Sequence, residues 1–337
     1  MMGEPAAKQK RVFITWDDHG SRAASLAFYL EAENHYVQSI RIRSMALVPL
    51  KYALNIFRTW SILLRERPEV VFIVAPPVFA VFPVWVYCRL SSCEYIIDTH
   101  CGALLDRRWA GFLRLHKFLA KGALVSILHN RALAERVATW GAVGVDMGDI
   151  LYRLPTSGTY ALRKGLNIVF VSTYSRDEPL NEVLEAARNV PEANFYITGR
   201  LDRAPEATVR KAPGNVVFTD YLGDEDYFAL LKGSDIVVSL TINDLTMQNG
   251  IYEAIALGRP SITSDWPVLR TSAPRGTIWI DNRSESLVCA IRAIERHYSR
   301  YLSEAEALRN EYRVNWEKKL AGLLKILDDG PSRAVGS

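Results

Sequence analysis

The chain has 337 residues, more than one hydrophobic core usually supports, so we expect two domains of about 150 residues each. Hydrophobic residues make up 49% and charged residues 23%, which excludes a disordered, collagen-like or coiled-coil protein. The net charge of +4 is uneven, because residues 1–155 carry 19 Lys and Arg against 13 Asp and Glu. This excess is too small and scattered for a nucleic-acid-binding protein, but it suggests that the first half faces an anionic partner.

The cysteines and the first residues bear on the compartment. The spacings of the cysteines match neither a zinc site nor a redox motif, so we expect reduced thiols in a cytoplasmic protein. These cysteines are Cys88, Cys93, Cys101 and Cys289. The polar stretch Met1–Lys10 lacks the apolar core of a signal peptide.

One uncharged stretch, Val70–Cys88, is long enough to cross a bilayer. Three prolines interrupt it, Pro76, Pro77 and Pro83, and each costs about 3 kcal/mol in a helix interior. A buried strand over Val70–Ala75 followed by a buried helix from about residue 78 to residue 90 fits this pattern better than a spanning helix.

Short β-branched runs alternate with helical patterns through the first half, which is typical of a parallel sheet. The segments expected to be strands are Val12–Thr15, Val37–Ile42, Val70–Ala75, Glu94–Asp98 and Leu124–Leu128. Helices are expected to begin near Ser21, Pro49, Val78, Arg107 and Ala132. A polar stretch with no apolar periodicity, Leu154–Gly165, follows as an expected linker between domains.

The same alternation restarts after this linker. Strands are expected over Asn167–Val171, Asn194–Thr198, Val216–Phe218, Asp235–Leu240, Ser261–Thr263 and Thr277–Ile280. Helices are expected over Leu180–Val190, Asp224–Lys232, Asn249–Leu257, Glu285–Tyr301 and Glu304–Leu327. The fold class is therefore α/β, with two doubly wound, Rossmann-like domains facing a central cleft. Ligands of such folds bind beyond the carboxyl ends of the strands.

The strongest local signal is the run QNGIYEAIALGRP over Gln248–Pro260. It predicts a helix that begins at Asn249, Gly250 and Ile251 and ends at a glycine, followed by a buried strand. The free N–H groups and partial positive charge of a helix N-terminus can hold a phosphate. Glu253, one turn inside, can accept hydrogen bonds from ribose hydroxyls. The alternative is that Glu253 is an ordinary acid in the first turn.

Two loops of the first half carry polar residues after predicted strands. His19, Gly20 and Ser21 follow the first strand, where a glycine and a helix start favour an anion or a close ligand. Asp98 and His100 follow the fourth strand, where an acid and an imidazole can orient one another or activate a hydroxyl. The adjacent Asp17 and Asp18 lack a third ligand, so we expect capping roles and no metal site.

Two segments of the first half are basic and amphipathic. For Pro49–Arg67 we favour a helix whose apolar residues face the core and whose basic residues are solvated. For Arg107–Lys121, which mixes five cations with aromatic and aliphatic residues, we favour contact with an anionic membrane surface. Each segment retains the other interpretation as its alternative.

The stretches Asp235–Leu240 and Ile251–Asp265 (IYEAIALGRPSITSD) resemble the nucleotide-sugar domain of the retaining family-4 glycosyltransferases, which have the GT-B fold. The stretch IIDTHCGAL and the helix around Trp316 resemble the acceptor domain and the last helix of that family. The resemblance implies an N-terminal acceptor domain over residues 1–157 and a donor domain over residues 158–312. A terminal helix over residues 313–330 is then expected to pack back on the first domain.

The resemblance also implies roles for individual residues. Glu253 occupies the second of two family acids and contacts the donor ribose, whereas the first acid falls on Leu245, so Asp244 is the nearest substitute. Arg176 takes the place of the family's diphosphate-gripping basic residue, and a guanidinium suits that task. The remaining donor residues are expected to be Ser172 and Thr173 near the phosphates, Gly199 and Arg200 near the nucleotide, and Tyr221 and Leu222 near the base.

The group that takes the acceptor proton is expected to differ between a retaining and an inverting enzyme. In the resembled family a histidine near His100 contacts the donor sugar, and the departing phosphate takes the acceptor proton. An inverting enzyme would instead use Asp98 or His100 as the base. We expect no metal or other cofactor, because Arg176 and the helix at Asn249 supply the positive charge.

Together these expectations describe a peripheral, cytoplasmic-face enzyme that moves a sugar from a nucleotide diphosphate sugar to a carbohydrate or polyprenyl-linked acceptor. A non-catalytic nucleotide-sugar-binding protein and a sugar-nucleotide epimerase remain alternatives. No G-x-G-x-x-G follows the first strand, which argues against a dehydrogenase.

Overall fold

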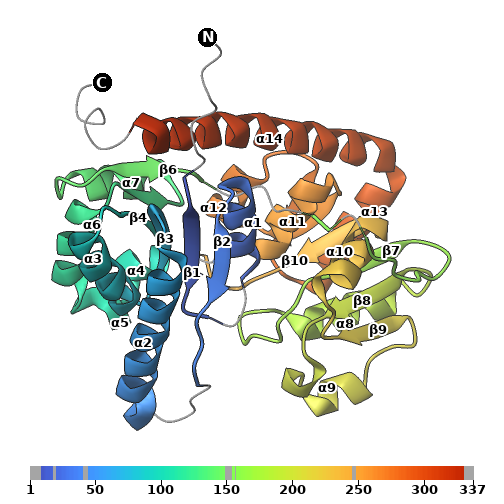
Figure 1. Ribbon diagram of the computed structural model, residues 1–337. Helices are drawn as coiled ribbons and strands as arrows, with labels where there is room; N and C mark the ends of the chain where they lie inside the picture. The colour runs from blue at the N-terminus through green and yellow to red at the C-terminus, as the bar shows by residue number, and fades with distance from the viewer. Residues whose placement is uncertain are drawn as a thin grey trace. The chain divides into compact units, whose positions relative to one another are not determined.

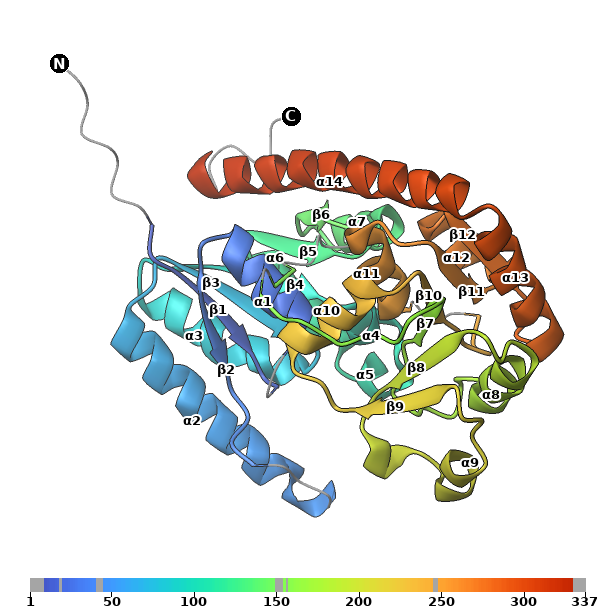
Figure 2. The same ribbon diagram turned by 90° about the vertical axis from the view of Figure 1, so that its right-hand side faces the viewer.

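The computed structural model describes residues 9–17, 20–40, 45–148, 154–155, 157–244 and 248–329. The chain divides into two compact units (Figures 1 and 2). The N-terminal unit comprises residues 1–153 and 315–337, and the C-terminal unit comprises residues 154–314.

The described part of the N-terminal unit is built on a six-stranded parallel sheet with the order β2-β1-β3-β4-β5-β6. The strands are β1 (Arg11–Thr15), β2 (Glu33–Tyr36), β3 (Val70–Ala75), β4 (Glu94–Thr99), β5 (Val125–Leu128) and β6 (Gly144–Asp146). The helices are α1 (Ser21–Tyr29), α2 (Val48–Glu66), α3 (Val81–Leu90), α4 (Cys101–Leu105), α5 (Arg107–Ala110), α6 (Leu113–Gly122) and α7 (Arg131–Ala138), with 3-10 turns at Met45–Leu47 and Val78–Ala80.

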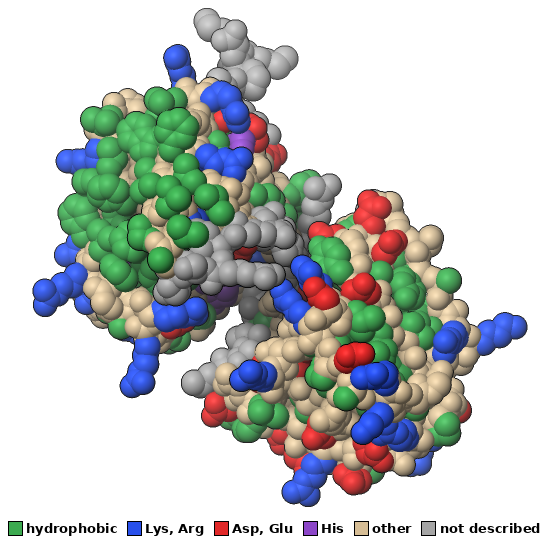
Figure 3. Space-filling view, turned by 90° about the horizontal axis from the view of Figure 1, so that it is seen from below, with side chains coloured by type: hydrophobic (Ala, Val, Ile, Leu, Met, Phe, Trp, Pro, Cys, Tyr) green, Lys and Arg blue, Asp and Glu red, His purple; other side chains and the backbone are tan. Residues whose placement is uncertain are grey.

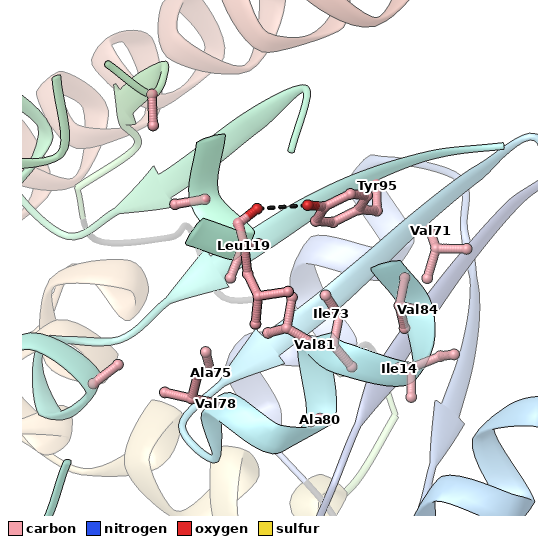
Figure 4. Packing of buried hydrophobic residues seen from close by; sticks show 14 of the residues in the cluster. Ile14, Val71, Ile73, Ala75, Val78, Ala80, Val81, Val84, Tyr95 and Leu119 are labelled. Carbon is pink, nitrogen blue, oxygen red and sulfur yellow. Dashed lines mark hydrogen bonds between the residues drawn. The ribbon is translucent and has the colours of Figure 1, made fainter. Parts of the chain in front are cut away.

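Helices cover both faces of this sheet, so its central strand is apolar along its whole length. All six residues of β3 are buried, and Ile73 packs with Val81 and Leu119 in one apolar layer (Figure 4). The Tyr95 hydroxyl donates a hydrogen bond of 2.5 Å to the Leu119 carbonyl across this layer. The segment Val70–Cys88 thus forms a strand, a 3-10 turn and a short helix. None of the described helices is both long and apolar enough to span a bilayer.

The described part of the C-terminal unit has a second six-stranded parallel sheet, of order β12-β11-β10-β7-β8-β9. The strands are β7 (Asn167–Phe170), β8 (Asn194–Thr198), β9 (Val216–Asp220), β10 (Ile236–Ser239), β11 (Ser261–Ser264) and β12 (Thr277–Ile280). The helices are α8 (Leu180–Asn189), α9 (Glu206–Arg210), α10 (Asp224–Gly233), α11 (Asn249–Leu257), α12 (Pro267–Ser272) and α13 (Ser284–Arg296), with a 3-10 turn at Leu201–Arg203. Two apolar clusters fill the two faces of the sheet, so this sheet is covered on both sides as well.

The last helix, α14 (Tyr298–Asp329), starts in the C-terminal unit and ends in the N-terminal unit. Its final turns are anchored by Trp316, Leu323 and Leu327, which are buried against the N-terminal sheet. The Trp316 ring lies 4.3 Å from that of Tyr29, centroid to centroid. The doubly wound α/β architecture with a C-terminal helix agrees with the sequence prediction.

Two predicted elements were misplaced. The strand expected over Val37–Ile42 lies earlier, at β2, because Glu33–Tyr36 pair with β1 as an edge strand that tolerates polar residues. The break expected between residues 301 and 304 lies at His297, and α14 runs without interruption from Tyr298. Hydrophobic periodicity alone does not reveal edge strands or the ends of exposed helices.

Candidate functional site

The predicted donor residues of the C-terminal unit lie after the carboxyl ends of four neighbouring strands, β10, β7, β8 and β9. The order of strands reverses between β7 and β10, because β8 and β9 lie on one side of this pair and β11 and β12 on the other. Ligands of open α/β sheets bind at such a switch point. The loops after β7 and β10 are therefore the first place to look for a binding site.

The loop after β7 wraps around a carboxylate of its own. Glu178 accepts hydrogen bonds from the Ser172 hydroxyl at 2.6 Å and from the Thr173 hydroxyl at 2.9 Å. The Thr173 backbone N–H also donates to it at 2.9 Å, and that of Ser175 donates at 3.3 Å. Tyr174 has a left-handed backbone (φ 57°), which turns these groups toward one point. The loop thus forms an anion-binding nest whose occupant is Glu178.

The arginine of this loop is left free for a ligand. Arg176 is exposed, and its side chain has no ion-pair or hydrogen-bond partner among the described residues. Its neighbour Asp177 points the other way, accepting a hydrogen bond from the Thr241 hydroxyl at 2.8 Å. The Asp177 carbonyl accepts a second one from the backbone N–H of Ile242, also at 2.8 Å. These bonds fasten the Arg176 loop to the loop after β10, on the two sides of the switch point.

The start of α11 comes close to the end of β7. A Cβ added to Gly250 would lie 2.8 Å from the Val171 Cβ and 2.9 Å from the Ser239 hydroxyl, so a larger residue does not fit. Gln248 precedes the helix and accepts a hydrogen bond from Ser239 at 2.9 Å, but no side chain caps the helix. Asn249 is exposed and Ile251 is buried. Among the described residues the backbone N–H groups of Asn249 and Gly250 therefore have no hydrogen-bond acceptor, whereas that of Ile251 donates to the Gln248 carbonyl at 3.1 Å.

Glu253 is buried within α11, and Tyr227 of α10 donates a hydrogen bond of 2.5 Å to its carboxylate. Burial, and to a smaller extent nearby Asp224, raise the pKa of Glu253, and the Tyr227 hydrogen bond lowers it. The resulting pKa is about 7. The sequence suggested two roles, a ribose ligand or an ordinary first-turn acid. A nearly buried carboxyl with one hydroxyl partner differs from a solvated helix-start acid and retains capacity for further donors.

The other predicted donor residues lie around the same sheet edge. Gly199 follows β8 with φ 107°, and a Cβ there would lie 2.4 Å from the Ser172 carbonyl oxygen. Arg200 is already paired with Asp202 at 2.7 Å. Tyr221 and Asp244 are exposed. Leu222 is half-buried and packs against an apolar cluster of this unit.

Some predicted residues cannot be placed. Leu245, the position of the first family acid, and His19 lie outside the described residues. Of the predicted phosphate loop in the N-terminal unit, Gly20 is the N-cap residue of α1, and its carbonyl accepts a hydrogen bond from the Tyr36 hydroxyl at 3.1 Å. Ser21 begins the helix.

The N-terminal unit holds a charged cluster at the end of β4. Asp98 is completely buried, and Arg22 of α1 reaches it through two nitrogens at 3.3 and 3.4 Å. The His100 Nε2 lies 3.2 Å from Oδ2 of the same carboxylate, an oxygen that the Arg22 Nε also contacts. Burial by itself raises the pKa of Asp98, but Arg22 and His100 outweigh it and hold this pKa below its ordinary value. Asp98 is therefore an ionised anchor, and His100, 37% exposed, is the member of the pair that a ligand can reach.

A second imidazole completes this cluster. His129 follows β5, and its ring packs edge-on against that of His100, with 5.0 Å between centroids. Burial lowers the pKa of His129 to about 3, and the nearby Arg22 lowers it further. His129 is therefore neutral at pH 7, which leaves it a hydrogen-bonding group rather than a charge.

Several of these residues were not predicted from the sequence. Glu178, Asp177 and Tyr227 belong to the C-terminal unit, and Arg22 and His129 belong to the N-terminal unit. A signal existed for His129, which directly follows a predicted strand just as His100 does. The pairing of Arg22 with Asp98 joins residues 76 positions apart, and no local pattern predicts it.

A group of possible metal ligands lies away from both sites. Glu33, His35 and Glu66 come together at the edge strand β2 and the end of α2. Glu66 is already engaged by Lys10 at 3.0 Å and by Arg65 at 2.6 Å. These hydrogen bonds lower the pKa of Glu66 to about 2, so the cluster is explained by ion pairing.

Comparisons with known proteins fit this arrangement. Residues 165–296 match the family described as glycosyl transferases group 1. No curated protein matches the chain.

Solved structures resemble the chain over nearly its whole length. A glycosyltransferase from Rickettsia africae has a TM-score of 0.68 at 13% identity, covering 97% of this chain and 100% of its own. HepE from Anabaena, solved in complex with UDP-glucose, has a TM-score of 0.63 at 12% identity, covering 94% and 100%. A candidate UDP-N-acetylglucosamine 2-epimerase from Listeria monocytogenes has a TM-score of 0.66 at 11% identity, covering 96% and 98%.

The match of residues 165–296 covers the strands and loops that carry Arg176 and Glu253. The likeness to the solved structures extends the same fold to the N-terminal unit. The chain thus has the GT-B fold and carries a group 1 glycosyltransferase domain over residues 165–296.

Proposed function

We propose that this enzyme transfers a sugar from a nucleotide diphosphate sugar, bound by the C-terminal unit, to a hydroxyl presented by the N-terminal unit. The observation that carries the proposal is the convergence at one switch point of a free guanidinium, an uncapped helix start and a buried carboxyl. These belong to Arg176, α11 and Glu253. A diphosphate suits the first two groups, and vicinal ribose hydroxyls suit the third.

The assignment of individual donor contacts follows from which groups are free. The hydroxyls of Ser172 and Thr173 were predicted to bind phosphate, but Glu178 already accepts their hydrogen bonds. We therefore assign the diphosphate to Arg176 and the first N–H groups of α11. Asn249 and Gly250 provide those groups, and Gly250 allows the close approach. Tyr221 and Leu222 are assigned to the base, and Gly199 with Arg200 and Asp244 to the rim of the site.

The proposed reaction retains configuration, as in the family-4 enzymes that the sequence resembles. The bond between the anomeric carbon and the diphosphate oxygen breaks, and the acceptor oxygen forms a bond to the same face of that carbon. The acceptor proton passes to the departing phosphate, so no protein base is required. Arg176 and the α11 dipole stabilise the charge that develops on the leaving diphosphate, a role that a metal ion fills in other enzymes.

In the N-terminal unit we assign His100 to the sugar or the acceptor hydroxyl, since its ring is accessible. Asp98 is a positioning residue, because its buried carboxylate holds the ring through Nε2. A lipid-linked or surface-polysaccharide acceptor suits the basic helices of this unit, with the enzyme lying peripherally at the cytoplasmic face of a membrane. The cations of Arg107–Lys121, among them the exposed Arg107, Arg108, Arg114 and Lys121, provide the attraction to anionic lipid.

The test is release of nucleoside diphosphate from a panel of sugar nucleotides, measured with and without added acceptor. Arg176→Ala should lower turnover by about 100-fold or more, because it removes the cation at the leaving group. Arg188→Ala, on the exposed face of α8, is the matched control and should leave turnover unchanged. Equal turnover of the Arg176 variant and the wild type would refute the role of Arg176.

An epimerase is the second candidate, because a candidate epimerase shares the fold over 96% of this chain. Epimerisation of a sugar nucleotide needs no acceptor and returns a sugar nucleotide isomer. Proton NMR of each sugar nucleotide incubated with enzyme alone distinguishes the two. A new isomer without acceptor favours the epimerase, and glycosylated product only with acceptor favours the transferase.

A further inference from the structure

Helix α2 has apolar side chains on its exposed side as well as on its buried side. The sequence led us to expect its apolar residues against the core, but the residues it buries completely include Asn55 and Thr59. Among its exposed residues the apolar ones form a row at spacings of three, four and seven, which places them on one side of the helix. This row consists of Leu47, just before the helix, and of Leu50, Leu54, Phe57 and Leu64, which are between 36% and 71% exposed.

Each of the two polar residues on the inner side makes one hydrogen bond to another segment, and the Asn55 Nδ2 is buried without a hydrogen-bond partner among the described residues. Thr59 accepts a hydrogen bond from the Trp16 indole at 2.9 Å, and Asn55 accepts one from the Ser39 backbone N–H at 3.1 Å. Tyr52, Ile56 and Trp60 complete the inner face and pack against the core of the unit. The inner side of the helix therefore packs against the unit without the outer row, whose side chains make no contribution to the core.

The apolar area extends beyond α2. Phe82 and Leu90 of α3 are exposed, as are Phe112, between α5 and α6, and Phe118 of α6. Figure 3 shows a broad apolar area on one face of the N-terminal unit, with Lys and Arg side chains around it. The C-terminal unit presents a mixed surface of both signs in the same view. Apolar area of this extent on one face marks an interaction site.

The charge on these helices has one sign. Helices α2, α3, α5 and α6 together contain nine Lys and Arg, and Glu66 is their single acid. Along α2 the cations Lys51, Arg58 and Arg65 recur every seven residues beside the apolar row. Glu66 is neutralised by its ion pairs with Lys10 and Arg65. An anionic partner is therefore attracted to this face.

We infer that the outer face of α2 is the element with which the protein docks on an anionic lipid bilayer. The leucines and Phe57 enter the boundary between headgroups and acyl chains, and the flanking cations contact lipid phosphates. This extends the proposed membrane location from the basic segment Arg107–Lys121 to a helix for which the sequence favoured the opposite orientation. It names the lipid surface, and not only the acceptor, as a partner of the N-terminal unit.

A second copy of the chain is a poorer occupant of the same face. Two copies of α2 packed together would bring like-charged rows of Lys and Arg into contact, and Glu66, the one acid of α2, is already paired with Lys10 and Arg65. Anionic lipid satisfies both the apolar row and the cations.

The experiment is flotation of the purified full chain with vesicles of phosphatidylcholine alone and with equal parts of phosphatidylcholine and phosphatidylglycerol. The wild type should float with the anionic vesicles and stay behind with the neutral ones. Phe57→Ser should weaken binding at least tenfold, since it removes the largest and most exposed apolar side chain of the row. Lys51→Glu should weaken it about fivefold or more. Val314→Ser and Arg210→Glu, at exposed positions in the C-terminal unit, are the matched controls.

Three results would overturn the inference. One is a wild type that does not bind anionic vesicles, and another is equal binding by Phe57→Ser and the wild type. The third is a dimer in solution that Phe57→Ser converts to monomer, which would assign the face to a second copy. Circular dichroism should show the same fold for all variants, since the substituted side chains are exposed. Sugar-nucleotide hydrolysis without vesicles should be unaffected by Phe57→Ser, so failure of docking and failure of the proposed transfer are separate outcomes.

Discussion

The two units share one architecture but place different chemistry at their sheet edges. In the N-terminal unit the charges are buried and paired, with Asp98 held between Arg22 and His100. In the C-terminal unit the negative charge of Glu178 is enclosed by its own loop, and Arg176 is left exposed beside it. An edge whose charges satisfy one another is built to position a side chain. A sheet edge at which a guanidinium has no ion-pair partner and a helix start has no side-chain cap can bind an anion.

The largest expected effect comes from breaking the buried pair of the N-terminal unit. Arg22→Ala leaves the carboxylate of Asp98 buried without its cation, and we expect a loss of about 3–5 kcal/mol in the free energy of unfolding. Denaturant unfolding at pH 7 measures it. Arg108→Ala removes a solvent-exposed partner of Asp106 and should change the free energy of unfolding far less. Similar losses for both variants would contradict the distinction between the two pairs.

The buried carboxyl of the C-terminal unit predicts a pH effect. The pKa of Glu253 is about 7 in the folded chain, above the ordinary value of 4.5. Folding is therefore favoured most below pH 4.5, and this contribution is lost as the pH rises toward 7. Glu253→Gln should remove that loss and be more stable than the wild type at pH 8, by at most about 3 kcal/mol. Unfolding curves between pH 5 and pH 8 test this; parallel curves for both proteins would contradict it.

The same substitution separates stability from binding. Glu253→Gln loses the anionic acceptor for ribose hydroxyls, so nucleotide affinity should fall about tenfold while stability at pH 8 rises. Titration calorimetry at pH 8 with a nucleotide that binds the wild type measures the affinity. An unchanged dissociation constant would remove Glu253 from the ribose site.

A smaller effect is expected from the turn after β8, which packs against the loop that follows β7. Gly199 has a positive φ, and an added Cβ would meet the Ser172 carbonyl oxygen. Gly199→Ala should cost about 1–3 kcal/mol of stability through backbone strain. Gly214→Ala, where a Cβ would meet no atom within 4 Å, is the control and should be nearly neutral. If both variants unfold at the same denaturant concentration, the turn is not constrained as described.

Much of the fold followed from the sequence because buried parallel strands and their following helices carry strong patterns. The strand at Val70–Ala75 and the helix at Asn249–Leu257 were predicted with their observed bounds. The orientation of α2 was wrong, because periodicity locates an apolar face but does not tell whether that face meets the core or another partner. The hydrogen bonds that bury Asn55 and Thr59 join distant segments and leave no local signal.

The sequence predicts which loops form the candidate site, but it does not predict which side chains contact one another there. Arg176 and Glu253 follow from their places after a strand and at a helix start. That Glu178 fills the nest expected to receive phosphate depends on a backbone turn at Tyr174, which sequence alone does not reveal. The same holds for Tyr227, whose partner Glu253 lies 26 residues away on another helix.

The central claim is that the edge formed by the Arg176 loop and the start of α11 binds a diphosphate. Its most direct test is calorimetric titration of the full chain with UDP, GDP, ADP and dTDP, in parallel for the wild type, Arg176→Ala and Arg188→Ala. At least one nucleotide should bind the wild type and Arg188→Ala alike, and bind Arg176→Ala at least tenfold more weakly. Equal affinity of all three proteins, or no binding of any nucleotide, would contradict the claim.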